Sequence, residues 1–252
     1  MKVISLNIRH GGGARVPRII EYLLAQAADV IVLTEFRENA KAPAIREALL
    51  GSGFIHTATA PTSGSSNSVG IWSRSGFEQK ANPGIEQADA HRLVSARLGR
   101  LEVHGVYFAG GKAKASLFDY LLQLVRSAPT QPTLVVGDFN TGLFLQDESG
   151  STFFCADRFG ALCGGDLIDC WRSRNPRGRE FTWYSHAGNG FRIDHALASS
   201  AMDRVIRDVR YDHTPRIERI TDHSALIVEL DEYAIQETHI GTESPKTQEI
   251  TA

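Results

Sequence analysis

The sequence predicts an α/β fold in which short buried strands alternate with amphipathic helices. Apolar runs at Val3–Ile8 and Val30–Leu33 flank a helical stripe from Ile19 to Ala27. This strand-helix-strand order is typical of two neighbouring parallel strands. A third run, Leu134–Val136, is uniformly apolar and rich in β-branched residues, as expected of a strand buried on both faces. Because the chain has 252 residues and no linker that would divide its folded part, we expect one domain over residues 1–230.

The remaining elements follow from the same patterns along the chain. Pro17 suits the first turn of the first helix. Apolar periodicity predicts further helices over residues 42–50, 112–126 and 153–162. Strands are expected at Val69–Trp72, Leu93–Leu98, Leu101–Phe108, Arg192–Leu197 and Ala225–Leu230. Gly99-Arg100, which separates two of these strands, favours a hairpin turn.

The last 22 residues, 231–252, lack the pattern of a folded segment. They contain five acidic residues, one lysine and few apolar side chains. Such a segment cannot bury enough apolar surface to offset the entropy of ordering it. We therefore expect residues 231–252 to form a polar, disordered tail.

Composition limits the compartment and the partners. The chain is 42% hydrophobic and 22% charged, with a net charge of −2, so a nucleic acid would have to be held by a local basic patch. Three cysteines, Cys155, Cys163 and Cys170, form no CxxC pair, which favours a reduced, cytoplasmic setting. No signal peptide and no run of membrane-spanning length is visible. We expect a monomer without an obligate protein partner.

Polar side chains stand at the ends of these apolar strands. Asp138 and Asn140 follow Leu134–Val136 and are two residues apart, so both point to the same side of an extended chain. One such pair is also typical of a simple turn. The full set, however, comprises Asn7, Glu35, Asp138, Asn140, Asp194 and the run Thr221–Ser224. Acids in apolar surroundings need hydrogen bonds or a metal, and these oxygen donors favour Mg²⁺, with Mn²⁺ or Ca²⁺ as alternatives.

Five motifs resemble the endonuclease/exonuclease/phosphatase superfamily in their order and rough separations. They are Leu6-Asn7, Thr34-Glu35, Gly137-Asp138-Phe139-Asn140, Arg192-Ile193-Asp194-His195 and Thr221-Asp222-His223-Ser224. The resemblance spans residues 2 to about 230. It implies a four-layer, deoxyribonuclease I-like sandwich, with two mixed β-sheets face to face, helices on both outer sides, and the site at one end between the sheets.

The resemblance also implies a role for each residue. Glu35 would be the main metal ligand, with Asn7 beside it and Asp222 near the metal. Asp138, helped by Asn140, would orient and deprotonate the attacking water. Asp194 would accept a hydrogen bond from His223, and this histidine would face the scissile phosphate. A carboxylate beside an imidazole raises the pKa of the ring, which makes His223 an electrophile rather than the base.

A second group of residues is similar to the exonuclease III and abasic-site endonuclease branch. The segments Gly165–Arg172 and Phe181–Tyr184 carry this similarity. Tyr107 resembles the active-site tyrosine of that branch and would contact a phosphate oxygen; the alternative is an aromatic at the edge of the core. Cations with interleaved aromatics suit a DNA backbone, and the alternative is a solvated loop. The substrate-binding candidates are Arg172, Arg174, Arg177, Trp183 and Lys112.

The leading hypothesis is therefore a Mg²⁺-dependent phosphodiesterase that acts on DNA, as an exonuclease or an abasic-site endonuclease, with Mn²⁺ as a substitute metal. One Mg²⁺ and an imidazole would neutralise the charge that develops on the phosphoryl oxygens. A second hypothesis keeps this chemistry for RNA, a small phosphoester, a phosphoinositide or a phospholipid head group. A third is a non-catalytic nucleic-acid binder, although every presumed catalytic position is filled.

Overall fold

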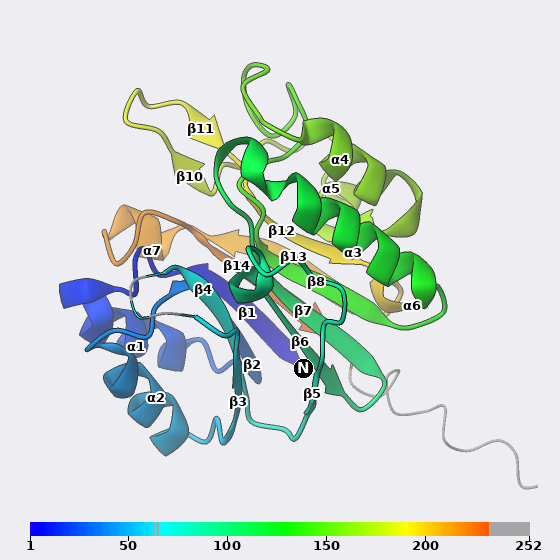
Figure 1. The fold of residues 1–252 in the computed structure, drawn as a ribbon. Coiled ribbons are helices and arrows are strands. Elements are labelled where there is room, and N and C mark those ends of the chain that lie inside the picture. The colour runs from blue at the N-terminus through cyan, green and yellow to red at the C-terminus, as the bar shows by residue number, and fades with distance from the viewer. Residues whose placement is uncertain (63, 65, 232–252) are drawn as a thin grey trace, which may run out of the picture.

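Two six-stranded sheets pack face to face, and helices cover their outer sides (Figure 1). This computed structural model describes residues 1–231 except positions 63 and 65. The architecture confirms the predicted four-layer sandwich of two mixed sheets. The prediction of a disordered tail concerns residues 231–252, which lie outside the described residues apart from Asp231. Within the described residues, no helix has the length and hydrophobicity needed to cross a bilayer.

The first sheet is built around the predicted parallel pair of the N-terminal strands. Within the described part of the chain, its one parallel pair consists of the first two strands, and the other strand pairs of this sheet are antiparallel. In spatial order it contains β13 (Ile206–Asp212), β14 (Ala225–Leu230), β1 (Lys2–Asn7), β2 (Val30–Phe36), β4 (Ser68–Ser73) and β3 (His56–Thr59). The C-terminal strand β14 therefore lies beside β1, which joins the two ends of the domain.

The second sheet repeats this plan with a parallel pair at its centre, β7 beside β8. In spatial order it contains β5 (Glu78–Lys80), β6 (Leu93–Leu98), β7 (Leu101–Tyr107), β8 (Thr133–Asp138), β12 (Asp194–Ala198) and β9 (Ile168–Asp169). The predicted hairpin joins β6 to β7, with Gly99 in the left-handed region at φ +58°. A separate hairpin pairs β10 (Trp183–Tyr184) with β11 (Gly190–Phe191).

Three apolar cores separate the four layers. Val3, Val32, Val103 and Val136 belong to the core between the sheets. A second core joins the first sheet to α1 (Val16–Ala25) and α2 (Ala42–Gly51), and a third joins the second sheet to α3 (Ala115–Ser127) and α4 (Ala156–Ala161). Shorter helices are α5 (Cys170–Arg174), α6 (Ser200–Asp203) and α7 (Thr214–Ile217).

Two predicted helices start later than expected. The expected helix over 112–126 opens with a 3₁₀ turn at Gly111–Lys114 before α3 begins. The expected helix over 153–162 begins at Ala156 and continues as a π-helical turn, Leu162–Asp166. Apolar periodicity located both helices but could not distinguish an α-helical first turn from a 3₁₀ turn or a loop.

Candidate active site

The alternation of side chains along the strands brings four predicted residues to one place. On β1, Val3 faces the core between the sheets and Ile4 faces the helices, so Asn7 falls on the inner face. The same alternation directs Tyr107, Asp138 and Asp194 to the inner face of the second sheet. Tyr107 and Asp194 are both register partners of Asp138. The carboxyl ends of the two parallel pairs, β1–β2 and β7–β8, thus lie at the same edge of the sandwich.

Asp138 is at the centre of this group and is 1% exposed. Its carboxylate accepts from Asn7 Nδ2 at 2.9 Å and from the Asn140 backbone amide at 2.8 Å. Asn140 has a left-handed φ of +50°, and its side-chain amide donates to the Phe108 carbonyl at 2.9 Å. Burial, reinforced by the charge of Asp194, raises the pKa of Asp138 to about 7. This carboxylate is therefore held rigidly and can accept a proton near neutral pH.

His223 and Asp194 form a buried imidazole-carboxylate pair. The distance from His223 Nδ1 to Asp194 Oδ2 is 2.8 Å, the arrangement that the resemblance implied. Tyr211 donates to the Asp194 carbonyl at 2.8 Å, and the Asp194 amide donates to Thr182 Oγ1 at 3.3 Å. Burial alone would lower the pKa of His223, but Asp194 outweighs it and raises this pKa to about 10. The ring is therefore an imidazolium at neutral pH, with Nε2–H as its remaining donor.

Glu35 reaches the site through an irregularity in β2. The pairing of β2 with β4 shifts register between Thr34 and Phe36, and Glu35 has a left-handed φ of +54°. This bulge lets Phe36 pack among the helices while the Glu35 carboxylate turns toward Asn7. Asn7 Nδ2 lies 3.2 Å from Glu35 Oε1 and also bonds Asp138. Glu35 and Asp138 are therefore joined through one amide nitrogen.

A left-handed loop follows β1 and supports Glu35. Residues 9–13, including the glycine run, all have positive φ between 52° and 77°. The His10 amide donates to Glu35 Oε2 at 2.8 Å, and the Gly11 amide donates to the Glu35 carbonyl at 2.8 Å. A Cβ at Gly11 would lie 2.6 Å from Asn39 Nδ2, so this position requires glycine. The loop also places Arg9 Nε 3.4 Å from Asp222 Oδ2.

Tyr107 completes the inner face of the site with a protonated hydroxyl. Its oxygen accepts from Asn67 Nδ2 at 3.1 Å, and Asn67 in turn accepts from Arg37 Nε at 2.5 Å. Burial, with the nearby charge of Glu35, raises the pKa of Tyr107 to about 12. Asn67 was not expected at the site, because it lies in a polar loop where asparagine is an ordinary turn residue.

Lys114 lies at the site, whereas the predicted Lys112 does not contact it. Lys114 Nζ donates to the Asn140 carbonyl, and burial lowers the pKa of this lysine to about 8. Lys112 is exposed on the preceding 3₁₀ turn. Lys112 stands two positions before the buried Lys114 on the same 3₁₀ turn. It therefore remains a candidate only for a substrate contact at the surface.

Comparisons with known proteins agree with this geometry. Residues 4–223 match the Endonuclease/Exonuclease/phosphatase family. The chain belongs to this family. It is therefore a phosphate-ester hydrolase.

Solved structures of the same architecture include two from Neisseria and one from an archaeon. The 3′ phosphatase NExo from Neisseria, bound to a product DNA hairpin, is 26% identical with a TM-score of 0.74 over 92% of this chain and 99% of that one. The 3′-5′ exonuclease NExo from Neisseria meningitidis is also 26% identical, with a TM-score of 0.74 over 92% and 100% of the two chains. An AP endonuclease from Archaeoglobus fulgidus, 21% identical, shares the fold with a TM-score of 0.75 over 92% and 99% of the chains.

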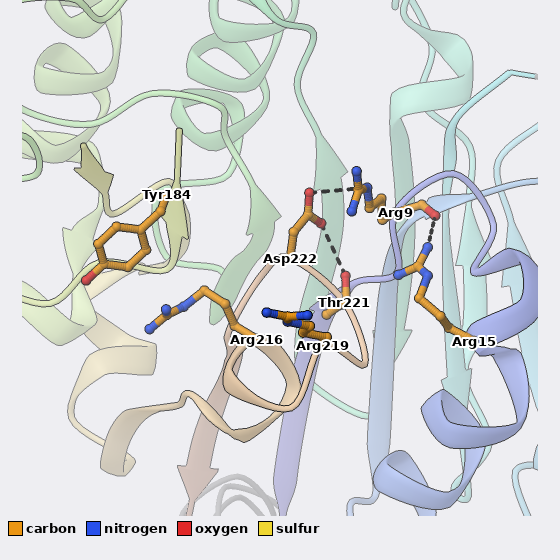
Figure 2. A pocket seen from close by; sticks show the side chains of 7 residues that line it. All are labelled: Arg9, Arg15, Tyr184, Arg216, Arg219, Thr221 and Asp222. Atoms are coloured by element: carbon orange, nitrogen blue, oxygen red, sulfur yellow. Dashed lines mark hydrogen bonds and ion pairs between the residues drawn. The ribbon is translucent and has the colours of Figure 1, made fainter. Parts of the chain in front are cut away.

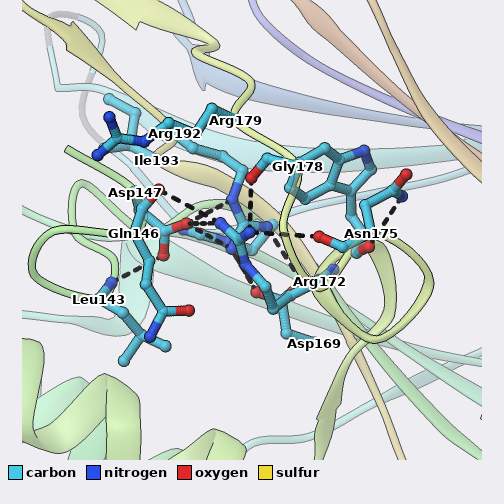
Figure 3. Close-up of polar contacts among 12 residues, drawn as sticks. Leu143, Gln146, Asp147, Asp169, Arg172, Asn175, Gly178, Arg179, Arg192 and Ile193 are labelled. Carbon is cyan, nitrogen blue, oxygen red and sulfur yellow. Dashed lines mark hydrogen bonds and ion pairs between the residues drawn. The ribbon is translucent and has the colours of Figure 1, made fainter. Parts of the chain in front are cut away.

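Two arginines that were predicted to bind substrate donate hydrogen bonds to protein acceptors. Arg172 donates to the Gly178 carbonyl at 2.7 Å and to Asp147 Oδ1 at 2.8 Å (Figure 3). Arg174 donates to Asp203 Oδ1 at 2.6 Å and to the Ile206 carbonyl at 3.0 Å. Protein acceptors thus engage both guanidinium groups, which gives Arg172 and Arg174 structural roles; phosphate contacts at these two positions stay a prediction.

The same network is completed by Arg192, the first residue of a predicted motif. Arg192 is fully buried and bonds Asp169 Oδ2 at 2.6 Å and Asp147 Oδ1 at 2.7 Å. Despite their burial, both carboxyls have lowered pKa values because of the charge of Arg192. This network anchors the loop before Asp194. By contrast, Arg177 is exposed, and the Trp183 ring is partly buried against Phe191 on the β10–β11 hairpin.

The donor set fits a divalent cation. Asp138, Asp194 and His223 each offer one donor atom within 4.8 Å of the other two. The raised pKa of Asp138 shows that the protein does not fully offset the buried negative charge. His223 is committed to Asp194 and is protonated, so it is a poor ligand. Carboxylate and amide oxygens therefore remain as ligands, and these suit a hard cation.

Proposed function

We propose that this protein is a Mg²⁺-dependent phosphodiesterase that hydrolyses DNA by in-line attack of an activated water. The observation that carries the proposal is the geometry around Asp138. This buried carboxylate is fixed by Asn7 and Asn140, is a register partner of Asp194, and has a pKa near 7. A general base works best when its pKa lies near the working pH.

The proposed metal ligands are Glu35, Asn7 and Asp222. The Glu35 side chain is 13% exposed and that of Asp222 34% exposed, so both carboxylates can be reached from solvent, unlike Asp194. When bound, Mg²⁺ would supply positive charge that offsets the charge on the phosphoryl oxygens. Mn²⁺, with similar ligand preferences, is the proposed substitute.

The remaining groups would orient and stabilise the substrate. Asp138 takes the proton of the attacking water, and Asn140 holds this carboxylate in position. The His223 imidazolium donates to a phosphoryl oxygen, where charge builds up in the transition state. Tyr107, whose pKa is raised to about 12, stays protonated and can donate to a second phosphate oxygen.

DNA is proposed as the substrate because two solved structures at 26% identity are named for reactions on nucleic-acid ends, one of them bound to a DNA hairpin. Exposed Arg177 and Lys112, with Trp183 on the hairpin, are the proposed contacts outside the catalytic centre. The three cysteines are free, which supports the proposed cytoplasmic setting; the protein is proposed to act as a monomer. Exonucleolytic and abasic-site cleavage are both consistent with this site.

The test compares three DNA substrates and two variants. An abasic-site duplex, a recessed intact duplex and a 3′-phosphate oligonucleotide are incubated with Mg²⁺, Mn²⁺ or chelator. Glu35→Ala is expected to lower metal-dependent cleavage by at least about 100-fold. Glu47→Ala, an exposed acid on α2, is the matched control and keeps the parent rate. Cleavage that survives Glu35→Ala or chelation contradicts the mechanism. An RNA oligonucleotide and a small phosphodiester are run beside the three DNA substrates, and turnover of either one without turnover of DNA contradicts the substrate.

A further inference from the structure

An arginine-lined pocket adjoins the catalytic centre (Figure 2). It encloses about 290 Å³ between the loop that follows β1 and the loop that follows α7. Its lining comprises Arg9, Arg15, Arg216, Arg219, Tyr184, Thr221 and Asp222. Asp222, a proposed metal ligand, lines this pocket and directly precedes His223 in the chain. A group bound in this pocket would therefore lie beside the proposed metal site.

The four arginines that line the pocket outnumber its acidic side chains. One carboxylate, Asp222, lines the pocket, and it pairs with Arg9. Arg15 donates to the neutral carbonyls of Ile220 at 3.1 Å and of Arg9 at 2.8 Å. Burial and the neighbouring charge of Arg9 lower the pKa of Arg15, as expected where cations crowd together. The pocket therefore has an excess of positive charge.

The two remaining arginines are available to a ligand. Arg216 Nε contacts Ser224 Oγ at 3.2 Å, and its guanidinium lies 4.6 Å from the Tyr184 ring centre. Within the described part of the chain, no hydrogen bond or ion pair reaches the Arg219 guanidinium, which is exposed. Arg219 also has a left-handed φ of +58°. This φ is that of an ordinary C-terminal helix cap, since the Arg219 amide donates to the Arg216 carbonyl at 3.1 Å and the Ile220 amide to the Pro215 carbonyl at 2.8 Å. The unpaired Arg219 guanidinium is thus the group that is available to a ligand.

We infer that this pocket binds a second phosphate group of the substrate, the one next to the phosphate that is hydrolysed. Guanidinium groups bind phosphate through paired, charge-assisted hydrogen bonds, and four arginines line this pocket, with the Arg219 guanidinium free to make them. This inference rests on the proposed phosphodiesterase function and deepens it, because it assigns a preferred substrate. A diester with an adjacent phosphate is bound better than an isolated one. The glycine run after β1 acquires a role here, since it places Arg9 and Arg15.

The test uses short thymidine substrates that differ only in phosphate number. The dinucleotide dTpdT has one phosphate, pdTpdT and dTpdTp add a terminal phosphate at either end, and dTpdTpdT adds an internal one. We expect the parent protein to cleave at least one two-phosphate substrate with a kcat/KM about tenfold above that of dTpdT, the effect of one charge-assisted contact. The two-phosphate substrate whose kcat/KM is raised shows whether the pocket binds a 5′-terminal, a 3′-terminal or an internal phosphate.

The variants assign that preference to the pocket. Arg219→Ala should reduce the two-phosphate to one-phosphate ratio to near one. Arg100→Ala, an exposed arginine in the β6–β7 turn at the opposite end of the second sheet, is the matched control and keeps the parent ratio. An unchanged ratio in Arg219→Ala, while cleavage persists, overturns the pocket but leaves the proposed function intact.

A binding measurement separates the two proposals. Calorimetry with metal-free Asp138→Asn protein and the preferred two-phosphate dinucleotide should show binding that Arg219→Ala weakens about tenfold. Binding with this arginine dependence, but without cleavage by the parent protein under any metal, supports the pocket and contradicts the phosphodiesterase. Equal affinity with and without Arg219 overturns the pocket.

Discussion

Asp138 and Asp194 face each other in register across the antiparallel strands β8 and β12. Two acids on the same face of neighbouring strands place their carboxylates close together, and each is at most 2% exposed. The two carboxyls differ in their surroundings. Asp194 is hydrogen-bonded to the His223 ring, whereas burial, reinforced by the charge of Asp194, raises the pKa of Asp138 to about 7. This difference, rather than the presence of two acids, suits Asp138 to base catalysis.

Asp138→Asn should reduce activity and increase stability. Loss of the base is expected to lower kcat by about 10²- to 10⁴-fold. Because the pKa of Asp138 rises from 3.8 to about 7 on folding, stability falls as the pH rises from 3.8 to 7, and the full cost is present above pH 7; an amide removes this cost. Thermal denaturation of the metal-free protein should show a higher Tm for the variant at pH 8 and a smaller gain at pH 5. Asp157→Asn, an exposed acid on α4, is the control, and a lower Tm for Asp138→Asn at pH 8 would contradict the charge conflict.

Asp194→Asn should lower the pKa of His223 from about 10 to below 6.5. The carboxylate is what raises this pKa against the opposing effect of burial, so burial prevails once the charge is removed. An NMR titration of the metal-free protein measures the shift directly, and kcat at pH 8 should fall as the imidazolium is lost. Asp208→Asn, a half-exposed acid on β13, should leave the His223 pKa unchanged. An unshifted His223 in Asp194→Asn would show that another group holds its proton.

Arg192→Met should destabilise the fold by about 3–5 kcal/mol, because it leaves two buried carboxylates without their cation. Asp147 and Asp169 have lowered pKa values, so their contribution to stability is present above pH 3.8 and is lost as the pH falls through the lower folded values. The difference in unfolding free energy should therefore shrink below pH 4 in urea titrations. Arg177→Ala, at an exposed position, should stay within about 0.5 kcal/mol of the parent. Equal effects of the two variants would contradict the structural role of Arg192.

His104 should make the fold sensitive to mild acid. This histidine is 3% exposed, and its Nδ1 lies 2.7 Å from Ser95 Oγ. Burial lowers its pKa from 6.5 to about 4. The unfolded chain therefore binds a proton before the folded protein does, and stability falls as the pH drops from 6.5 to 4. The loss is on the order of 3 kcal/mol. Unfolding titrations should show that the unfolding free energy of His104→Gln depends less steeply on pH than that of the parent. An unchanged slope would show that another group causes the acid sensitivity.

Residues whose position depends on strand alternation could be placed from the sequence. Asn7, Asp138 and Asp194 each lie at an even spacing from a core-facing residue on their strand, so their convergence needed only the correct sheet topology. Glu35 is different. Simple alternation would have turned it toward the helices, and the bulge at Thr34–Phe36 reverses this. A bulge depends on the partner strand, which a single strand does not reveal.

The arginine run could not be interpreted in this way. Arg172 and Arg174 find their partners at Asp147 and Asp203, which are 25 and 29 residues distant in the chain. The sequence around an arginine does not distinguish a residue that anchors a loop from one that binds a phosphate. Lys112 and Lys114 differ only in the phase of a 3₁₀ turn. Side-chain roles that depend on distant partners therefore required the structure.

The pairing of β14 with β1 has a consequence for biosynthesis. These strands join residues 225–230 to residues 2–7, and His223 is only two residues before β14. The imidazolium therefore cannot reach Asp194 until the end of the domain has been translated and has left the ribosome. The nascent chain, which is made beside messenger and ribosomal RNA, therefore lacks the His223–Asp194 pair on which the proposed mechanism depends.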